Sequence, residues 1–186
     1  MTCELILGGA RSGKSRFAEQ SALESGLAVT VIATAEALDD EMQARIRRHQ
    51  HDRPAGWHTI EAPRQLAAAL RTHAAADRCL IVDCLTLWLT NLLLDGDPQT
   101  EVAPAAFHLD TPPALRAARD ELLDTLPTLP GRILLVANEV GLGLVPETPL
   151  GRLFRDEAGR LNQIVATRCS RVVFVAAGLP LILKQG

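Results

Sequence analysis

One eight-residue segment near the start of the chain constrains the fold more than any other feature. Gly8 to Ser15 read GGARSGKS and fit G-x-x-x-x-G-K-[ST], the phosphate-binding loop of nucleoside-triphosphate enzymes. An apolar run, Cys3–Leu7, precedes the segment as a strand would, and Lys14–Glu24 follows it with the composition of a helix. An ordinary glycine-rich turn can match the pattern by chance, but the strand–loop–helix setting favours a phosphate site.

The residue types of this loop suit a triphosphate. Glycines allow the backbone to close around phosphate groups and to point several N–H groups at them, and the positive end of the helix dipole adds to the attraction. Lys14 would reach the β- and γ-phosphates, and the Ser15 hydroxyl would bind Mg²⁺. ATP or GTP with Mg²⁺ is therefore the expected ligand.

The rest of the chain alternates between apolar strands and helical stretches. The predicted strands are Cys3–Leu7, Leu27–Ala33, Cys79–Asp83, Arg132–Ala137 and Arg171–Ala177. The predicted helices are Lys14–Ser25, Asp39–His49, Arg64–Ala76, Thr86–Leu94, Pro113–Leu126 and Gly151–Arg168. Continuous apolarity indicates strands buried on both faces, as in a parallel sheet, so the prediction is an α/β doubly wound fold.

Length and composition narrow the class of protein. A chain of 186 residues fits one domain, residues 1–186, with Asp95 to Pro113 as an irregular, proline-containing excursion. The net charge of −3 argues against a general nucleic-acid binder, and no apolar run is long enough to span a membrane. The four scattered cysteines lack C-x-x-C spacing, and Cys3 and Cys79, in or beside apolar strands, fit small buried residues. The expected compartment is a reducing cytoplasm.

Two carboxylates follow predicted strands and are candidates for the metal site. Ligands in doubly wound sheets gather beyond the carboxyl ends of the strands, which unites Gly8 to Ser15, Thr34, Asp83 and Asn138-Glu139. Asp83 is the preferred Mg²⁺ ligand, with a helix N-cap as the alternative. Glu139 is a rival or helper that could instead cap the loop after it.

A dense cationic segment, Arg45 to Arg53, holds four arginines and two histidines. Pro54 ends the predicted helix soon after, which leaves the histidines near a helix end. A histidine beside a nucleotide can be a base, a phosphate ligand or a nucleophile that forms a phosphoramidate. Phosphate contacts by Arg45, Arg48 and Arg53 are the alternative, and a solvated helix face is the plainest one.

Three segments together resemble one family. The loop GGARSGKS, the segment AxxxDDEMxxRIxxHxxxRPxxW from Ala35 to Trp57, and NEVGLGLVPETPLGRLFRDEAGRLNQ from Asn138 to Gln163 are similar to the bifunctional adenosylcobinamide kinase / adenosylcobinamide-phosphate guanylyltransferase of cobalamin biosynthesis. The resemblance runs in register over nearly the whole chain, although Asp95 to Pro113 match the family poorly.

The resemblance implies a RecA-like P-loop NTPase domain that assembles as a homotrimer. It implies a kinase step, in which ATP or GTP phosphorylates the aminopropanol hydroxyl of adenosylcobinamide, and then GMP transfer from GTP onto that phosphate. The family's guanylylated histidine falls on His49, with His51 as a lesser candidate, and Lys14 serves both reactions. The nucleotide-contacting positions fall on Gly8, Gly9, Ala10, Arg11, Ser12, Gly13, Lys14, Ser15, Ala33, Thr34, Ala35, Gln50, His51, Asp52, Arg53, Glu61 and Asp83.

Two other readings stay open at this point. A small-molecule or nucleoside kinase would use the same loop without a covalent intermediate. A guanine-specific switch protein usually carries N-K-x-D after a strand, whereas Asn138 is followed here by Glu-Val-Gly, which disfavours that class.

Overall fold

The computed structural model describes residues 2–36, 53–54, 56–94 and 110–186. Its strands form one seven-stranded sheet in the order β3-β2-β4-β5-β1-β6-β7. Neighbouring strands run parallel except β6 and β7, which are antiparallel. The strands are β1 (Thr2–Gly8), β2 (Ala28–Ala33), β3 (His58–Glu61), β4 (Arg78–Asp83), β5 (Arg132–Asn138), β6 (Arg171–Ala176) and β7 (Leu179–Gln185). This is the mostly parallel α/β sheet expected for a RecA-like P-loop domain.

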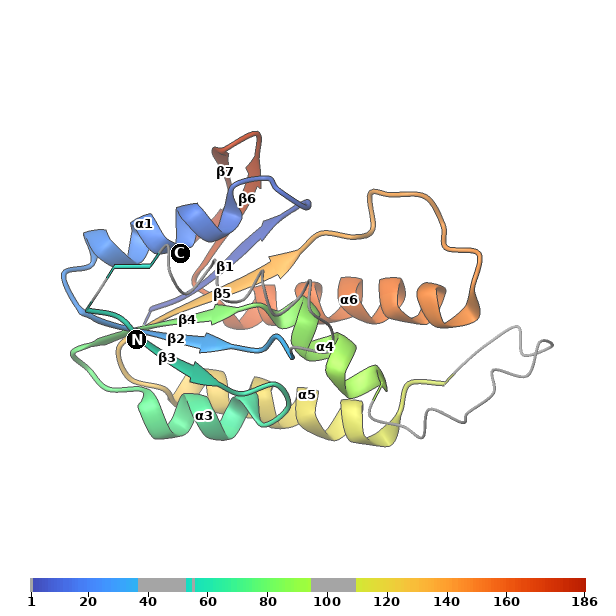
Figure 1. The fold of residues 1–186 in the computed structure, drawn as a ribbon, viewed down its shortest axis with the longest axis horizontal. Coiled ribbons are helices and arrows are strands. Elements are labelled where there is room, and N and C mark those ends of the chain that lie inside the picture. The colour runs from blue at the N-terminus through green and yellow to red at the C-terminus, as the bar shows by residue number, and fades with distance from the viewer. Residues whose placement is uncertain (1, 37–52, 55, 95–109) are drawn as a thin grey trace.

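Helices cover both faces of the sheet (Figure 1). They are α1 (Lys14–Glu24), α3 (Leu66–His73), α4 (Leu85–Leu94), α5 (Pro113–Thr125) with a short 3₁₀ turn (Leu126–Thr128), and α6 (Pro149–Arg168). Helix α1 lies on one face, and the other four helices lie on the opposite face. The predicted helix Asp39–His49 lies outside the described residues. Within the described part of the chain, no helix has the length and apolarity needed to cross a membrane.

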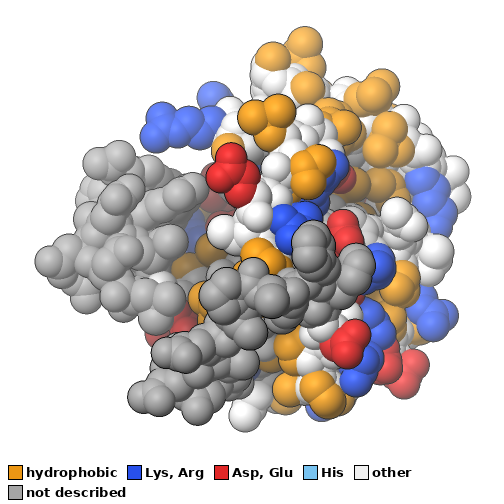
Figure 2. Space-filling model, turned by 90° about the vertical axis from the view of Figure 1, so that its right-hand side faces the viewer, with side chains coloured by type: hydrophobic (Ala, Val, Ile, Leu, Met, Phe, Trp, Pro, Cys, Tyr) orange, Lys and Arg blue, Asp and Glu red, His pale blue; other side chains and the backbone are white. Residues whose placement is uncertain are grey.

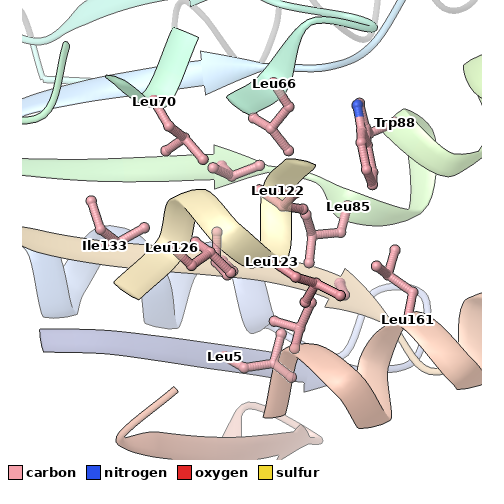
Figure 3. Close-up of a cluster of buried hydrophobic side chains, with 14 of the residues drawn as sticks. Leu5, Leu66, Leu70, Leu85, Trp88, Leu122, Leu123, Leu126, Ile133 and Leu161 are labelled. Carbon is pink, nitrogen blue, oxygen red and sulfur yellow. The ribbon is translucent and has the colours of Figure 1, made fainter. Parts of the chain in front are cut away.

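The alternation of side chains along β1 explains why Leu5, Ile6 and Leu7 are consecutive apolar residues. Leu5 and Leu7 belong to the cluster under α3 to α6, whereas Ile6 belongs to the cluster under α1. Figure 3 shows the larger cluster, in which Trp88 of α4 lies near leucines from α3 and α5. A strand buried on both faces needs apolar residues at consecutive positions, and β1 thereby holds the phosphate-binding loop at a fixed edge of the sheet.

Two strands were absent from the sequence-based prediction. β3 has four residues, three of them exposed, so it lacks an apolar signal. β7 contains Pro180 and is exposed along its whole length, which is typical of an edge strand. It follows β6 through Ala177 and Gly178, whose φ angles of 53° and 78° fit a tight hairpin turn.

The buried carboxylate of Glu4 links β1 to the strands on either side of it. Glu4 is 3% exposed. One of its oxygens accepts from Arg171 Nη1 at 2.9 Å, and the other lies 3.2 Å from Arg132 Nη2. These two arginines come from β6 and β5, the strands on either side of β1. The cluster therefore fixes the amino-terminal end of the strand that carries the phosphate-binding loop.

Glu4→Gln is expected to lower the free energy of unfolding by about 2 kcal/mol, because one of the two charge-assisted hydrogen bonds is lost inside the protein. Urea unfolding followed by circular dichroism measures the change. Glu24→Gln is the matched control, since Glu24 is exposed on α1 and its substitution should change stability by less than about 0.5 kcal/mol. Equal midpoints for the two variants would contradict the role of Glu4.

Candidate active site

The phosphate-binding loop joins β1 to α1 at the carboxyl end of the sheet (Figure 1). Gly13 has a φ of 97°, a conformation that favours glycine, and α1 begins at the next residue. A Cβ on Gly8 would lie 2.4 Å from Ser12 Oγ and 2.5 Å from the carbonyl oxygen of Val175. The glycines at both ends of the motif are therefore required by the path of the loop.

Lys14 folds back over its own loop. Its Nζ donates to the carbonyl oxygen of Gly9 at 3.1 Å, and the residue is 9% exposed. Ser12 Oγ is buried, and the described part of the chain offers it no hydrogen-bond partner. A cationic group held across the loop and an unsatisfied hydroxyl within it both suit a polyphosphate.

Asp83, Ser15 and Arg53 meet at one small hollow, which Glu19 also lines. Asp83 ends β4, and Ser15 belongs to the first turn of α1. Arg53 Nη2 lies 3.7 Å from Asp83 Oδ2, and Arg53 Nη1 donates to Thr59 Oγ1 at 3.0 Å. The predicted proximity of Ser15 and Asp83 is therefore observed, together with an arginine from the cationic segment.

The donor set of this hollow fits a divalent cation. A hydroxyl and a carboxylate are hard oxygen ligands of the kind Mg²⁺ prefers, and Mg²⁺ usually keeps water and phosphate oxygens as its other ligands. The described part of the chain contains no group of three or more His, Cys, Asp or Glu side chains that could hold a metal ion. Ser15 and Asp83 are the residues that could hold it.

Thr34 and Asn91 fix the turn that follows Asp83. Thr34 is fully buried, and its hydroxyl both donates to the carbonyl of Cys84 and accepts from the Cys84 N–H, at 2.7 and 2.9 Å. Asn91 Nδ2 donates to the carbonyl of Thr34 at 2.7 Å. Thr34 therefore positions the turn beside the carboxylate, and its direct contact with a nucleotide stays a prediction. No sequence signal identified this pairing across fifty residues.

Cys84 is a poor candidate for a nucleophile although it follows Asp83. Burial raises the pKa of the Cys84 thiol, and the negative charge of Asp83 raises this pKa further. The thiolate is the nucleophilic form of cysteine, so the neutral thiol of Cys84 is inert at neutral pH. All four cysteines are buried with free thiols, and for Cys3 and Cys79 burial was the prediction from sequence.

Glu139 caps its own loop in this structure. Its Oε1 accepts from the N–H of Gly141 at 2.7 Å, which is the alternative that sequence analysis left beside a metal role. Its own N–H donates to the carbonyl of Gly8 at 3.0 Å, so the loop after β5 is tied to the start of the phosphate-binding loop. The preceding residue, Asn138, donates its N–H to Thr86 Oγ1 at 2.7 Å.

The other predicted site residues form two groups, those within the described part of the chain and those outside it. Glu61 and Asp83 both pair in register with Ala33, so the three residues end adjacent strands at the same edge. Ala10 and Arg11 are exposed on the loop, and Ala35 follows β2 directly after Thr34. The predicted residues His49, Gln50, His51 and Asp52 lie outside the described residues, as do Arg45 and Arg48 of the cationic segment.

Comparison with known proteins identifies the family. The sequence profile described as "Cobinamide kinase / cobinamide phosphate guanyltransferase" matches residues 4–183. A Pseudomonas aeruginosa protein, "Bifunctional adenosylcobalamin biosynthesis protein CobP", is 58% identical over 97% of this chain and 96% of its own length. The Salmonella typhimurium "Bifunctional adenosylcobalamin biosynthesis protein CobU" is 41% identical over 97% of this chain and 98% of its own length.

Among solved structures, the flagellar accessory protein FlaH of Methanocaldococcus jannaschii aligns with a TM-score of 0.48 and 16% identity, over 100% of this chain and 79% of that one. The family profile covers nearly the whole chain and includes the phosphate-binding loop, Asp83 and the loop after β5. The chain therefore belongs to the bifunctional cobinamide kinase / cobinamide phosphate guanyltransferase family of cobalamin biosynthesis.

Proposed function

We propose that the chain performs both reactions at the one site, acting first as a kinase on adenosylcobinamide and then as a guanylyltransferase on the phosphorylated product. The observation that carries this proposal is the convergence of Lys14, Ser15, Asp83 and Arg53 at the carboxyl edge of the sheet. Cations and a metal-ligating pair at one place suit attack on a bound triphosphate, where positioning and charge neutralisation supply most of the catalysis.

The kinase step needs no covalent intermediate on the protein. The aminopropanol hydroxyl attacks the γ-phosphorus of ATP or GTP, the bond from that phosphorus to the β-phosphate bridging oxygen breaks, and the nucleoside diphosphate leaves. Lys14 neutralises the charge that gathers on the β- and γ-phosphates, and the backbone of Gly8 to Ser15 orients them. Mg²⁺ held by Ser15 and Asp83 supplies further charge neutralisation when it is bound.

The guanylyl transfer uses His49 in this proposal. An imidazole nitrogen attacks the α-phosphorus of GTP, pyrophosphate leaves, and a phosphoramidate bond holds GMP on the histidine. An oxygen of the substrate phosphate then attacks that phosphorus, and the phosphorus–nitrogen bond breaks to release adenosylcobinamide-GDP. Arg53, placed beside Asp83, is suited to stabilise negative charge on the nucleotide in both steps.

We further infer a cytoplasmic homotrimer. Free buried thiols are typical of proteins in a reducing compartment, and the cytoplasm is such a compartment and contains the nucleoside triphosphates that both reactions use.

The support for assembly is β7, an edge strand on which four apolar residues are exposed: Leu179, Leu181, Ile182 and Leu183. Exposed apolar edge strands favour pairing with another chain. Light scattering should give three times the mass of one chain, and a monomer in the active preparation would refute the assembly.

Incubation of the purified protein with Mg²⁺ and GTP labelled at the α-phosphate tests the covalent step. Acid-labile GMP retained on the protein and mapped to His49 is the expected result. Label on His51 would keep the function but move the nucleophile by two residues. Failure of an active, GTP-binding preparation to retain label would favour a kinase without a covalent intermediate.

A further inference from the structure

An apolar groove lies between the end of α4 and the start of α6, and the reaction chemistry described above does not use it. Its volume is about 330 Å³, which is within the range of small-molecule sites. Apolar side chains of α4 and α6 form most of it, with threonines among them. The lining residues are Thr90, Leu93, Leu94, Thr148, Leu150, Gly151 and Phe154.

The wall contributed by the start of α6 is fixed by specific contacts. Thr148 caps α6, because its Oγ1 accepts from the N–H of Gly151 at 3.1 Å. Arg152 Nη1 donates to the carbonyl oxygens of Pro146 and Glu147, at 3.2 and 2.7 Å. A Cβ on Gly151 would lie 2.7 Å from the Pro146 ring, so only glycine allows this close packing. The groove is therefore built by the protein rather than left by loose packing.

One wall of the groove begins beside Asp83, and the other follows a loop that is bonded to the phosphate-binding loop. α4 starts at Leu85, two residues after Asp83, and its ten residues carry the chain roughly 15 Å to Leu94. The loop that leads to Thr148 starts at Glu139, whose N–H bonds to Gly8. The end of the groove at Leu94 thus lies about one length of α4 from the end of β4.

The loop between β5 and α6 also presents apolar side chains to solvent. Leu142, Leu144 and Val145 are 82%, 96% and 64% exposed. Figure 2 views the molecule from the side to which the strands of Figure 1 point, and hydrophobic side chains appear there among Lys and Arg side chains. Exposed apolar side chains gathered near a nucleotide site favour a bulky, partly apolar second substrate over a small polar one.

We propose that the groove between α4 and α6 binds the corrin ring of the acceptor. This inference rests on the proposed function, since that function requires an acceptor with a large macrocycle. A ring seated against Leu94 and Phe154 would lie beyond the carboxyl ends of the strands, as the phosphate loop does, and Thr90 and Thr148 can hydrogen-bond the amide groups at its rim.

Leu94→Asp tests the proposal, with Leu23→Asp as a matched control. Leu94 is 51% exposed in the groove, and Leu23 is 50% exposed on α1, so both variants add one charge at a half-exposed helical leucine. The acceptor is dicyanocobinamide. Equilibrium dialysis measures its binding, steady-state kinetics measure its KM in the kinase step, and a fluorescent GTP analogue reports the nucleotide site.

Leu94→Asp should weaken dicyanocobinamide binding and raise its KM at least tenfold, with GTP affinity within twofold of wild type. Leu23→Asp should leave all three quantities within twofold. Leu94→Met should restore corrinoid binding, and Leu94→Asn serves as a second variant if the aspartate variant does not fold. Corrinoid binding unchanged in folded Leu94 variants would overturn the groove assignment. Wild-type protein that binds dicyanocobinamide but does not phosphorylate it would instead refute the proposed function and leave the groove intact.

Discussion

Lys14→Ala is expected to lower the rates of the kinase step and of guanylyl transfer by about 10²–10³-fold each. Lys14 is held across the loop by its contact with the Gly9 carbonyl, which places its charge where the β- and γ-phosphates would bind. In the proposed mechanism one triphosphate site presents the γ-phosphorus of ATP or GTP to the aminopropanol hydroxyl and the α-phosphorus of GTP to His49. A single cation that fixes this triphosphate therefore serves both reactions.

The measurement compares kcat/KM for phosphorylation of cobinamide with the rate of GMP adduct formation from labelled GTP. Arg16→Ala is the control, because Arg16 is an exposed basic residue two positions further along the same helix. Its rates should stay within about twofold of wild type. Wild-type guanylyl transfer in Lys14→Ala, with only the kinase step impaired, would show that the two reactions hold the triphosphate differently.

The central part of the fold follows directly from the sequence. The five predicted strands are β1, β2, β4, β5 and β6, each confirmed to within one residue at either end. Consecutive apolar residues indicate that a strand is buried on both faces of the sheet. Leu5 and Ile6 of β1 are an example, because they pack against helices on opposite faces. Parallel order then places the strand ends at one edge, so the proximity of Asp83 to the phosphate loop follows from topology.

The details that shape the site depend on contacts that no local pattern encodes. Thr34 bonds to Cys84 across fifty residues, and Arg53 reaches Asp83 across thirty. The first pair forms because β2 and β4 are neighbours in the sheet, in register at Ala33 and Asp83, and the second joins the segment before β3 to the end of β4. A threonine after a strand has the same local appearance whether it contacts a ligand or a backbone turn, so the bonds of Thr34 to Cys84 could not be predicted, and its contact with a nucleotide, which the resemblance implies, stays a prediction.

The edges of the sheet were missed for a related physical reason. β3 and β7 are edge strands, each with a single neighbour, and neither needs the continuous apolarity that identifies a central strand. In β7 the apolar residues are present but exposed, and Pro180 is a residue type that argues against predicting a strand. Its pairing with β6 depends on the tight turn at Ala177–Gly178, which lies beyond what apolar periodicity can detect.

His49→Ala is expected to abolish GMP adduct formation, with at least a thousandfold loss of guanylyl transfer, while the kinase step keeps at least a third of its rate. In the proposed mechanism only the second reaction requires a nucleophile on the protein, and alanine cannot form the phosphoramidate. The kinase step depends in this proposal on Lys14, Ser15 and Asp83, which the substitution leaves in place.

Two histidine variants serve as controls in the same assays, which are retention of labelled GMP and turnover of cobinamide. His51→Ala should retain the adduct, since His51 is the lesser candidate, and His73→Ala, at the end of α3 away from the loop, should leave both activities unchanged. Equal loss of the two activities in His49→Ala would mean that this histidine positions the triphosphate rather than carrying GMP. Loss of the adduct in His51→Ala alone would transfer the nucleophilic role to that residue, with the division between the two steps preserved.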